Sequence, residues 1–407
     1  MLKSWWMRWR KFLPDMLAIV EIIARILIFL IGSYIIVEVV SAAIRTFVLP
    51  RSVFVALTGV VFRLTYALFR FRASKKASYE ERDAIMALFA PIALLMQPVV
   101  WIVLIIIGYT LIFWATTTIS LYDAFSLSGS SLLTLGFTKS EGVGSLIVEF
   151  SASVLGLTMV ALLIAYLPTM YAAFSKRETL VTMLETRAGS PPSPVDMFIR
   201  VNDIRGLEAI NAMWEPWEVW FAEVDETHTS LVALVFFRSP DPHRSWITAG
   251  GVMLDTASLM ISAVDVEVSP NAQLMIRAGY IALRHIADYF SIDYDANPKS
   301  DDPISISKFE FHEALNQLAA AGVPLKADRE QAWRDYSGWR VNYDRPLLAL
   351  AALTMAPYAP WVSDRSLPHI FQVETPNAAG ITSSLVRRVL RRKQALPQGN
   401  SDNRRKL

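Results

Sequence analysis

The stretch DAFSLSGSSLLTLGFT, residues 123–138, is a short polar segment between two long runs that carry no charged residue. The runs cover residues 84–122 and 150–175, and each is long enough to cross a membrane. Asp123 can cap a helix start, and the roughly ten residues after it would form a helix about 15 Å long, half of a bilayer's hydrocarbon thickness. The stretch therefore predicts a re-entrant segment that returns to the side it left.

The functional signal lies in the residues after this predicted half-helix, Thr134, Leu135, Gly136, Phe137 and Thr138. Irregular backbone at membrane depth persists only where protein buries it or where it lines a wet cavity. A glycine permits dihedral angles that turn successive carbonyls the same way, and a ring of carbonyls can replace the water shell of a cation. These residues predict an ion selectivity filter. The alternative is a polar loop that only connects two spans.

Residues 97–176 resemble the pore domain of the potassium channel family, including its two-pore-domain-like bacterial members: a span, a pore helix, a filter and a second span that contains Gly156. The usual filter of that family reads Thr-Val-Gly-Tyr-Gly. The resemblance implies a homotetramer, because one loop per chain cannot surround an ion. It gives the place of the threonine to Thr134, of the valine to Leu135, of the first glycine to Gly136 and of the tyrosine to Phe137.

Two residues depart from the family pattern. Thr138 replaces the second glycine and Lys139 replaces the usual aspartate. Because a β-branched residue at positive φ is an outlier, we expect an altered outermost ion site. A threonine at this place also occurs in cyclic-nucleotide-gated channels, which discriminate weakly among monovalent cations. The permeant ion is expected to be a monovalent cation, and potassium is the favoured candidate. No cofactor or bound metal is expected.

Two residues of the second pore span have alternative interpretations. Gly156 is a candidate gating hinge, and the alternative is close helix packing through a small residue. Glu149 lies near the outer end of the same span, where a carboxylate would raise the local cation concentration. Its alternative role is a hydrogen bond to the back of the filter loop.

Basic residues cluster in residues 1–25, in the loop 70–82 and at Lys176 and Arg177. Positive loops stay on the cytoplasmic side, so the pattern predicts a multi-pass protein of the plasma (inner) membrane with both termini in the cytoplasm. An even number of crossings must then separate the N terminus from the loop 70–82. The N-terminal segment 1–25 and the basic tail 384–407 are expected to contact membrane lipid.

The predicted fold class is an all-α membrane protein with about four transmembrane helices, one re-entrant pore helix with its filter loop, and an all-helical cytoplasmic C-terminal domain. The outer pore helix is expected to begin at Pro98, because a proline breaks the helix hydrogen-bond pattern. Segment 52–69 either spans the membrane or lies in its interface. The other expected spans are 26–48, 98–114 and 144–173. The predicted division is 1–25 interfacial N-terminus, 26–83 first two membrane segments and basic loop, 84–176 pore domain, 177–194 linker, 195–383 helical cytoplasmic domain, and 384–407 basic tail.

The C-terminal half has apolar residues at helical spacing and no alternating strand pattern. It lacks a glycine-rich nucleotide-binding turn, phosphate loops and serine nucleophile elbows, so an enzyme is not expected. Trp214, Trp217 and Trp220 recur every three residues and predict a helix core rather than a cofactor site. The amphipathic segments are 217–225, 245–263, 272–290 and 308–321.

Metal and nucleic-acid sites are also disfavoured. Glu223, Glu226 and His228 would not share one helix face well, which argues against a metal site. The chain has no cysteine, which excludes thiolate chemistry. Its basic residues flank membrane segments and its net charge is only +2, so nucleic acid is not an expected partner.

These observations predict a channel for passive cation conduction through a tetrameric pore. The alternative function is a non-conducting membrane-anchored sensor or scaffold whose helical cytoplasmic domain binds a ligand. Thr138 and Lys139 favour this alternative, whereas Thr134, Gly136 and Gly156 favour the channel.

Overall fold

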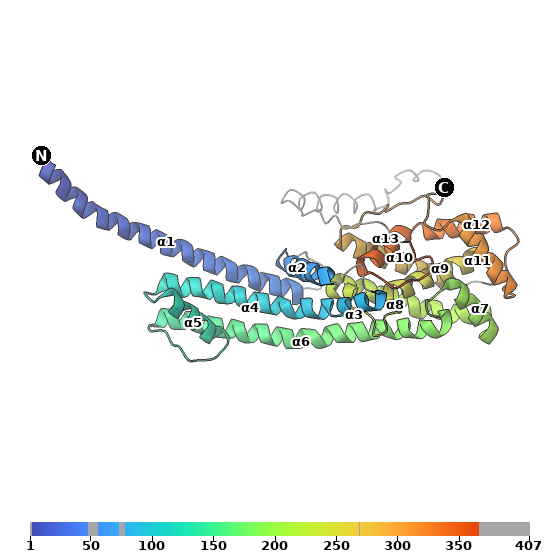
Figure 1. Cartoon of the computed structure of the whole chain (residues 1–407), viewed down its shortest axis with the longest axis horizontal. Helices are drawn as coiled ribbons and strands as arrows, with labels where there is room; N and C mark the ends of the chain where they lie inside the picture. The colour runs from blue at the N-terminus through green and yellow to red at the C-terminus, as the bar shows by residue number, and fades with distance from the viewer. Residues whose placement is uncertain (1, 48–55, 73–77, 268, 366–407) are drawn as a thin grey trace, which may run out of the picture. The chain divides into compact units, whose positions relative to one another are not determined.

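The computed structural model describes residues 2–47, 56–72, 78–267 and 269–365, with the side chains of the first helix described from Met16 onward. Within these ranges every named element is a helix, and the single extended pairing is an isolated bridge between Val264 and Leu325 (Figure 1). This confirms the predicted all-helical class. The predicted tail 384–407 lies outside the described residues. The elements are α1 (Leu2–Phe47), α2 (Ala56–Arg72), α3 (Tyr79–Ala87), α4 (Phe89–Thr116), α5 (Leu121–Leu132), α6 (Val143–Ala188), α7 (Pro194–Arg205), η1 (Leu207–Met213), α8 (Trp214–Ser230), η2 (Val232–Phe236), α9 (Trp246–Ala263), α10 (Asn271–Tyr289), α11 (Lys308–Ala320), α12 (Arg329–Arg340) and α13 (Asp344–Thr354).

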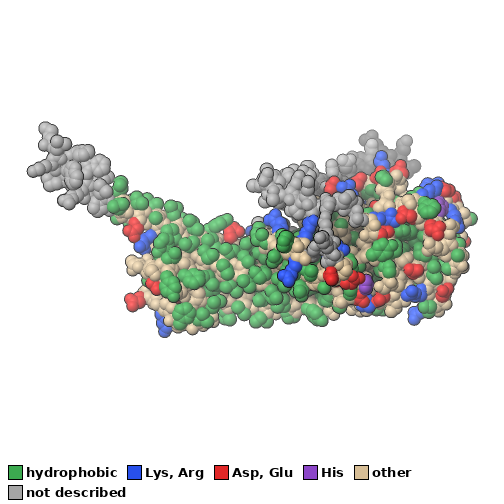
Figure 2. Space-filling model, viewed as in Figure 1, with side chains coloured by type: hydrophobic (Ala, Val, Ile, Leu, Met, Phe, Trp, Pro, Cys, Tyr) green, Lys and Arg blue, Asp and Glu red, His purple; other side chains and the backbone are tan. Residues whose placement is uncertain are grey.

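Four helical stretches among the described residues are long and apolar enough to cross a membrane: Met16–Thr46, Tyr79–Thr116, Val143–Ala188 and Trp246–Ala263. They support the prediction of a membrane protein with about four such helices. The fourth stretch differs from the other three because 94% of its apolar window is buried inside the protein, against 22%, 39% and 22%. α9 is therefore a core helix of the C-terminal part. Figure 2 shows hydrophobic side chains gathered over α1, α4 and α6, and charged ones over the C-terminal helices.

α1 packs antiparallel along α4. Near one end the Arg25 guanidinium donates to the carbonyl of Thr117, which follows the last residue of α4, at 2.8 Å. Near the middle the helices touch through two glycines, since a Cβ added to Gly32 would lie 2.6 Å from the carbonyl oxygen of Gly108. At the other end Ala43 packs in one cluster with residues of the first half of α4. α1 thus runs along α4 from the end of α4 to its beginning.

α2 covers most of the expected segment 52–69, and it does not run the length of α4. The number of membrane crossings before the loop 70–82 stays a prediction. Gln97 donates to Thr58 at the start of α2 at 2.9 Å, and the rings of Phe62 and Tyr66 pack against Phe89. The contacts of α2 therefore concentrate on the first third of α4.

The predicted break at Pro98 is absent, because α4 runs through it from Phe89 to Thr116. Pro91 lies in the first turn, where backbone N–H groups have no partner within the helix and a proline costs little. Pro98 removes one interior hydrogen bond, but it lies buried beside α2, and packing on both sides holds the helix together. Residues 84–97 therefore belong to α3 and to the first part of α4, apart from Leu88 between the two helices.

The C-terminal part packs around α9, every residue of which is buried except Ile261. Trp214, Trp217 and Trp220 on α8 are at most 2% exposed, as expected for core residues. At the centre, Arg340 donates to both carboxylate oxygens of Asp255 at 2.6 Å, and both side chains are fully buried. A buried ion pair is favourable only when its geometry is good and its other hydrogen bonds are made. Because Arg340 lies on α12 and Asp255 on α9, the pair fixes the register of the two helices.

Candidate functional site

α5 is the short helix predicted between the two long apolar helices (Figure 1). Its N-cap is Ser120 rather than the expected Asp123. The Ser120 hydroxyl accepts from the Asp123 N–H at 3.1 Å and donates to its carboxylate at 2.7 Å. Asp123 thus lies in the first turn, where its charge favours the helix dipole. The helix has 12 residues, about 18 Å at 1.5 Å per residue.

α5 is held between α4 and α6 by polar contacts as well as by apolar packing. The Ser128 hydroxyl donates to the carbonyl of Ile106 on α4 at 2.9 Å. From the other side, the Ser153 hydroxyl of α6 donates to the carbonyl of Ser131 at 2.9 Å. These serines allow a polar helix to lie against two apolar ones without leaving buried groups unpaired.

In the loop after α5, residues 133–142, four consecutive backbone N–H groups donate hydrogen bonds to one residue, Ser130. The Ser130 carbonyl accepts from the N–H of Leu135 at 2.8 Å and from that of Gly136 at 3.4 Å. The Ser130 hydroxyl accepts from the N–H of Phe137 at 3.1 Å and from that of Thr138 at 3.3 Å. Sequence reasoning missed Ser130, because hydrogen bonds from a loop to a helix depend on a register that the sequence alone does not display.

The direction of the carbonyls of residues 134–137 follows from this arrangement. In a trans peptide the C=O points opposite to the N–H of the next residue. Since the N–H groups of residues 135–138 face Ser130, the four preceding carbonyls face the opposite side of the loop. These carbonyls point away from Ser130, and carbonyl oxygens are the groups that can replace the water shell of a cation.

The φ angles of residues 134–137 alternate in sign. Thr134 has φ 55° and Gly136 has φ 71°, whereas Leu135 and Phe137 have negative φ. Alternation between the two signs keeps successive carbonyls on one side. The strained residue is Thr134, a β-branched side chain at positive φ. The strain was expected at Thr138, which has no positive φ, so the departure from the family pattern lies beyond the four aligned carbonyls.

Within one chain this loop is open to the outside. The side chains of Leu135 and Phe137 are 61% and 67% exposed. Lys139 is exposed as well, and Thr138 is half-buried. A single chain therefore supplies one wall of a site and leaves the carbonyl side without an enclosure.

Glu149 supports the back of the loop. Its side chain is 8% exposed, and its Oε1 accepts from the N–H of Ser140 at 2.5 Å. A carboxylate committed to this hydrogen bond fixes the far end of the loop to α6. Of the two roles expected for Glu149, the geometry favours the hydrogen bond over an electrostatic effect on free cations.

Gly156 lies where α6 crosses the end of α5. A Cβ added there would stand 1.8 Å from the carbonyl oxygen of Leu132, the last residue of α5. No side chain fits this approach, so the geometry favours the packing role of Gly156. Its role as a gating hinge stays a prediction.

Where α6 meets the C-terminal helices, Arg177 is the central contact. It is 3% exposed, and its guanidinium donates to the carbonyls of Leu234 and Phe237 at 2.8 Å each and to the Glu178 carboxylate at 2.7 and 2.9 Å. It also faces the His228 ring, with Nη1 and Nε2 3.0 Å apart. From the sequence, Arg177 was expected only to mark the cytoplasmic end of a span, because basic residues gather on that side.

His228 is neutral in this arrangement. Burial, with the Arg177 charge as the second cause, holds the pKa of His228 well below its ordinary value of 6.5. Its Nε2 must accept from the guanidinium, so the ring proton lies on Nδ1, 3.1 Å from the Thr227 hydroxyl. Glu223, another suggested metal ligand, pairs with Lys176 at 2.5 Å. Among the described residues no three potential ligands lie together.

A second arginine joins α3 to the C-terminal part. Arg238 pairs with the buried Asp83 of α3 and donates to the carbonyl of Thr354 at 2.7 Å. We call residues 231–239, which contain η2 and Arg238, the η2 segment. The ring of Phe236 packs edge-on against Phe89 at 5.4 Å. The η2 segment therefore contacts both α4 and α6.

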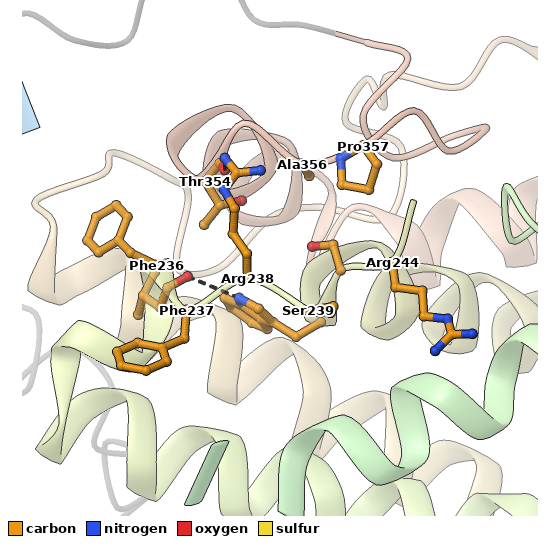
Figure 3. A pocket seen from close by; sticks show the side chains of 11 residues that line it. Phe236, Phe237, Arg238, Ser239, Arg244, Thr354, Ala356 and Pro357 are labelled. Atoms are coloured by element: carbon orange, nitrogen blue, oxygen red, sulfur yellow. Dashed lines mark hydrogen bonds between the residues drawn. The ribbon is translucent and has the colours of Figure 1, made fainter. Parts of the chain in front are cut away.

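A small pocket lies beside the η2 segment (Figure 3). Its volume is about 20 Å³, which holds about one water molecule. In Figure 3 the side chain of Arg238 reaches towards Thr354, while that of Arg244 points away. The hydroxyl of Ser239 and the Nε of Arg244 have no protein partner. One water suits this pocket.

Comparisons with family models, with curated proteins and with solved structures gave no match. The likeness to potassium channels consequently rests on residues 97–176 and their motif. A functional assignment has to be carried by the geometry of the loop after α5.

Proposed function

We propose that this chain is one subunit of a channel for passive conduction of a monovalent cation, with potassium the expected ion. The observation that carries the proposal is the turning of four consecutive N–H groups onto Ser130. It leaves the carbonyls of residues 134–137 aligned on the side away from α5. No enzymatic role is proposed.

Four copies of this loop around a common axis would surround an ion with carbonyl oxygens. A dehydrated cation would exchange its water shell for these oxygens, and four loops supply enough of them. The C-terminal end of α5 would add a favourable dipole potential. The same assembly would cover Leu135 and Phe137, which one chain leaves exposed.

We further propose that α1, α4 and α6 cross the plasma membrane and that α5 is re-entrant. α2 would lie in the interface at the cytoplasmic end of α4, and the C-terminal helices would lie in the cytoplasm. The N-terminal end of α1 then lies on the side of the loop after α5, because Arg25 contacts Thr117 at the far end of α4. This revises the expectation that both termini share the cytoplasm.

The runner-up, a non-conducting sensor with a ligand-binding C-terminal part, has less support. Thr138 and Lys139 lie beyond the aligned carbonyls. The pocket beside the η2 segment holds about one water, so it gives a small-molecule ligand no room. A scaffold would also have no use for the strained backbone at Thr134.

Flux of potassium or rubidium into vesicles that contain the purified protein tests the proposal. We expect flux for the natural chain and its loss in Gly136→Asp, which forces a side chain onto a positive φ within the carbonyl row. The matched control is Gly144→Asp, the same change in an open position of the first turn of α6. Equal flux in the natural chain and Gly136→Asp would overturn the proposal.

A further inference from the structure

α2 has two apolar faces. One face packs against the protein through Phe62, Tyr66 and Phe69, whose rings contact Phe89. The other points outward and is built from residues spaced three or four apart, so they share one side of the helix. These outward side chains are Val60, Leu64, Leu68 and Phe71, exposed by 41%, 69%, 67% and 90%.

Two arginines flank the outward face. Arg63 and Arg70 are exposed and lie seven residues apart, so they stand two turns apart along nearly the same line of the helix. The Nε of Arg63 donates to the carbonyl of Gly59 at 3.2 Å, which orients the guanidinium and leaves both terminal nitrogens free. Neither arginine forms an ion pair with a carboxylate in the described part of the chain.

The position of α2 limits what can cover this face. Its partners on α4 lie between Phe89 and Gln97, the beginning of the long apolar helix. An apolar face beside the end of a membrane span, with arginines at its edge, matches the boundary between acyl chains and headgroups. Guanidinium groups bind phosphate through paired N–H donors.

We propose that the outward face of α2 binds anionic phospholipid of the cytoplasmic leaflet, with Arg63 and Arg70 contacting the phosphate groups. The apolar side chains Leu64, Leu68 and Phe71 enter the acyl region. The proposal rests on the proposed membrane placement of the chain, but it does not require conduction. Because Phe62 and Tyr66 pack on α4, a lipid bound here sits next to the start of the outer pore helix.

The test counts lipids retained by the purified full-length protein in native mass spectrometry, with phosphatidylglycerol and phosphatidylcholine offered in equal amounts. We expect selective retention of phosphatidylglycerol. In Arg63→Gln/Arg70→Gln its affinity should fall roughly fivefold for each arginine, while phosphatidylcholine is unaffected. The matched control is Arg205→Gln/Arg277→Gln, which removes two exposed arginines of the C-terminal part and should leave retention unchanged.

Two further arms keep the result decisive. Arg63→Lys/Arg70→Lys should retain part of the selectivity, because the charge stays and only the paired donors are lost. Inorganic phosphate at millimolar concentration should not displace the lipid, since it lacks acyl chains. Unchanged phosphatidylglycerol retention in the glutamine variant would overturn the proposal, as would equal retention of both lipids or displacement by free phosphate. Flux in vesicles of phosphatidylcholine alone reports on conduction separately.

Discussion

At the scale of single residues, Ser130 has the largest consequence for the proposed filter. It is 1% exposed and is the shared acceptor for the loop's N–H groups through both its carbonyl and its hydroxyl. The filter motif was visible in the sequence because glycine and threonine at that spacing are uncommon between two spans. Ser130 was not visible, because its role depends on the loop folding back along α5.

Replacing Ser130 by alanine should weaken ion selection more than it weakens folding. The change removes the acceptor of the Phe137 and Thr138 N–H groups, so the last carbonyls of the row lose their fixed direction. Each lost hydrogen bond is worth about 1 kcal/mol. We expect the ratio of potassium to sodium permeability to fall several-fold.

Reversal potentials in planar bilayers measure this ratio. Ser126→Ala is the control, since Ser126 lies on the same helix and its hydroxyl makes no hydrogen bond with the described residues. A permeability ratio that is unchanged in Ser130→Ala would show that the Ser130 hydroxyl does not orient the filter.

His228 gives a prediction for the dependence of stability on pH. Its pKa in the folded protein is held well below 6.5, so the unfolded chain binds the proton more readily. The contribution of neutral His228 to the free energy of unfolding is fully present above pH 6.5 and is lost as the pH falls below that value. Acid should therefore loosen the contact between Arg177 and the η2 segment.

Thermal unfolding of the purified protein at pH 7.5 and 5.5 tests this prediction. We expect the drop in Tm towards pH 5.5 to be smaller in His228→Gln than in the natural chain. His243→Gln, at an exposed position, should leave the drop unchanged. His285 acts in the opposite sense, because its hydrogen bond to Asp225 raises its pKa and its contribution is lost as the pH rises. An equal drop in both variants would exclude the His228 mechanism.

At the scale of helices, the crossing of α5 and α6 decides whether Gly156 is a packing residue or a hinge. Gly156→Ala places a methyl group 1.8 Å from the Leu132 carbonyl, and such overpacking typically costs about 1–3 kcal/mol. We expect a lower Tm and a displaced filter loop. Gly144→Ala, where nothing lies within 4 Å, should behave as the natural chain.

Tm and single-channel recordings of these two variants separate the roles. An unchanged Tm together with altered opening in Gly156→Ala would support the hinge and contradict the packing role. A reduced Tm, with reduced conduction and normal opening of the remaining channels, is the outcome we expect.

Helix prediction succeeded where periodicity was strong and failed where packing overrode a local signal. The segments 245–263, 272–290 and 308–321 agree with α9, α10 and α11 within a residue or two at each end, because their apolar residues recur at helical spacing. Pro98 was predicted to break a helix that tertiary packing keeps continuous. α9 is apolar enough for a span, yet its position at the centre of the C-terminal part depends on contacts that hydropathy does not report.

At the scale of the whole molecule, the proposed topology rests on the contacts between α1 and α4 rather than on charge alone. The basic residues of the N-terminus and of the loop 70–82 suggested a common side. The antiparallel contact places Arg25 of α1 at the end of α4 opposite to the one that α2 contacts, so we propose that the two basic segments lie on different sides. Charge bias sets topology on average, whereas the packing of Gly32 on Gly108 is specific to this pair of helices.

The absence of cysteine makes this topology directly testable. In spheroplasts, a membrane-impermeant maleimide should label Glu21→Cys and Lys139→Cys but not Asp265→Cys, which should react only after lysis. If Glu21→Cys, like Asp265→Cys, reacted only after lysis, the N terminus would lie on the cytoplasmic side. That result would contradict the proposed topology of α1.

The most direct test of the proposed function is a density map of the full-length protein in lipid nanodiscs, recorded in potassium and again in thallium. We expect four chains around one axis, the carbonyl oxygens of residues 134–137 facing that axis, and thallium density between them. A monomer, or a loop whose carbonyls face away from any shared axis, would contradict the assignment of this chain as a channel subunit.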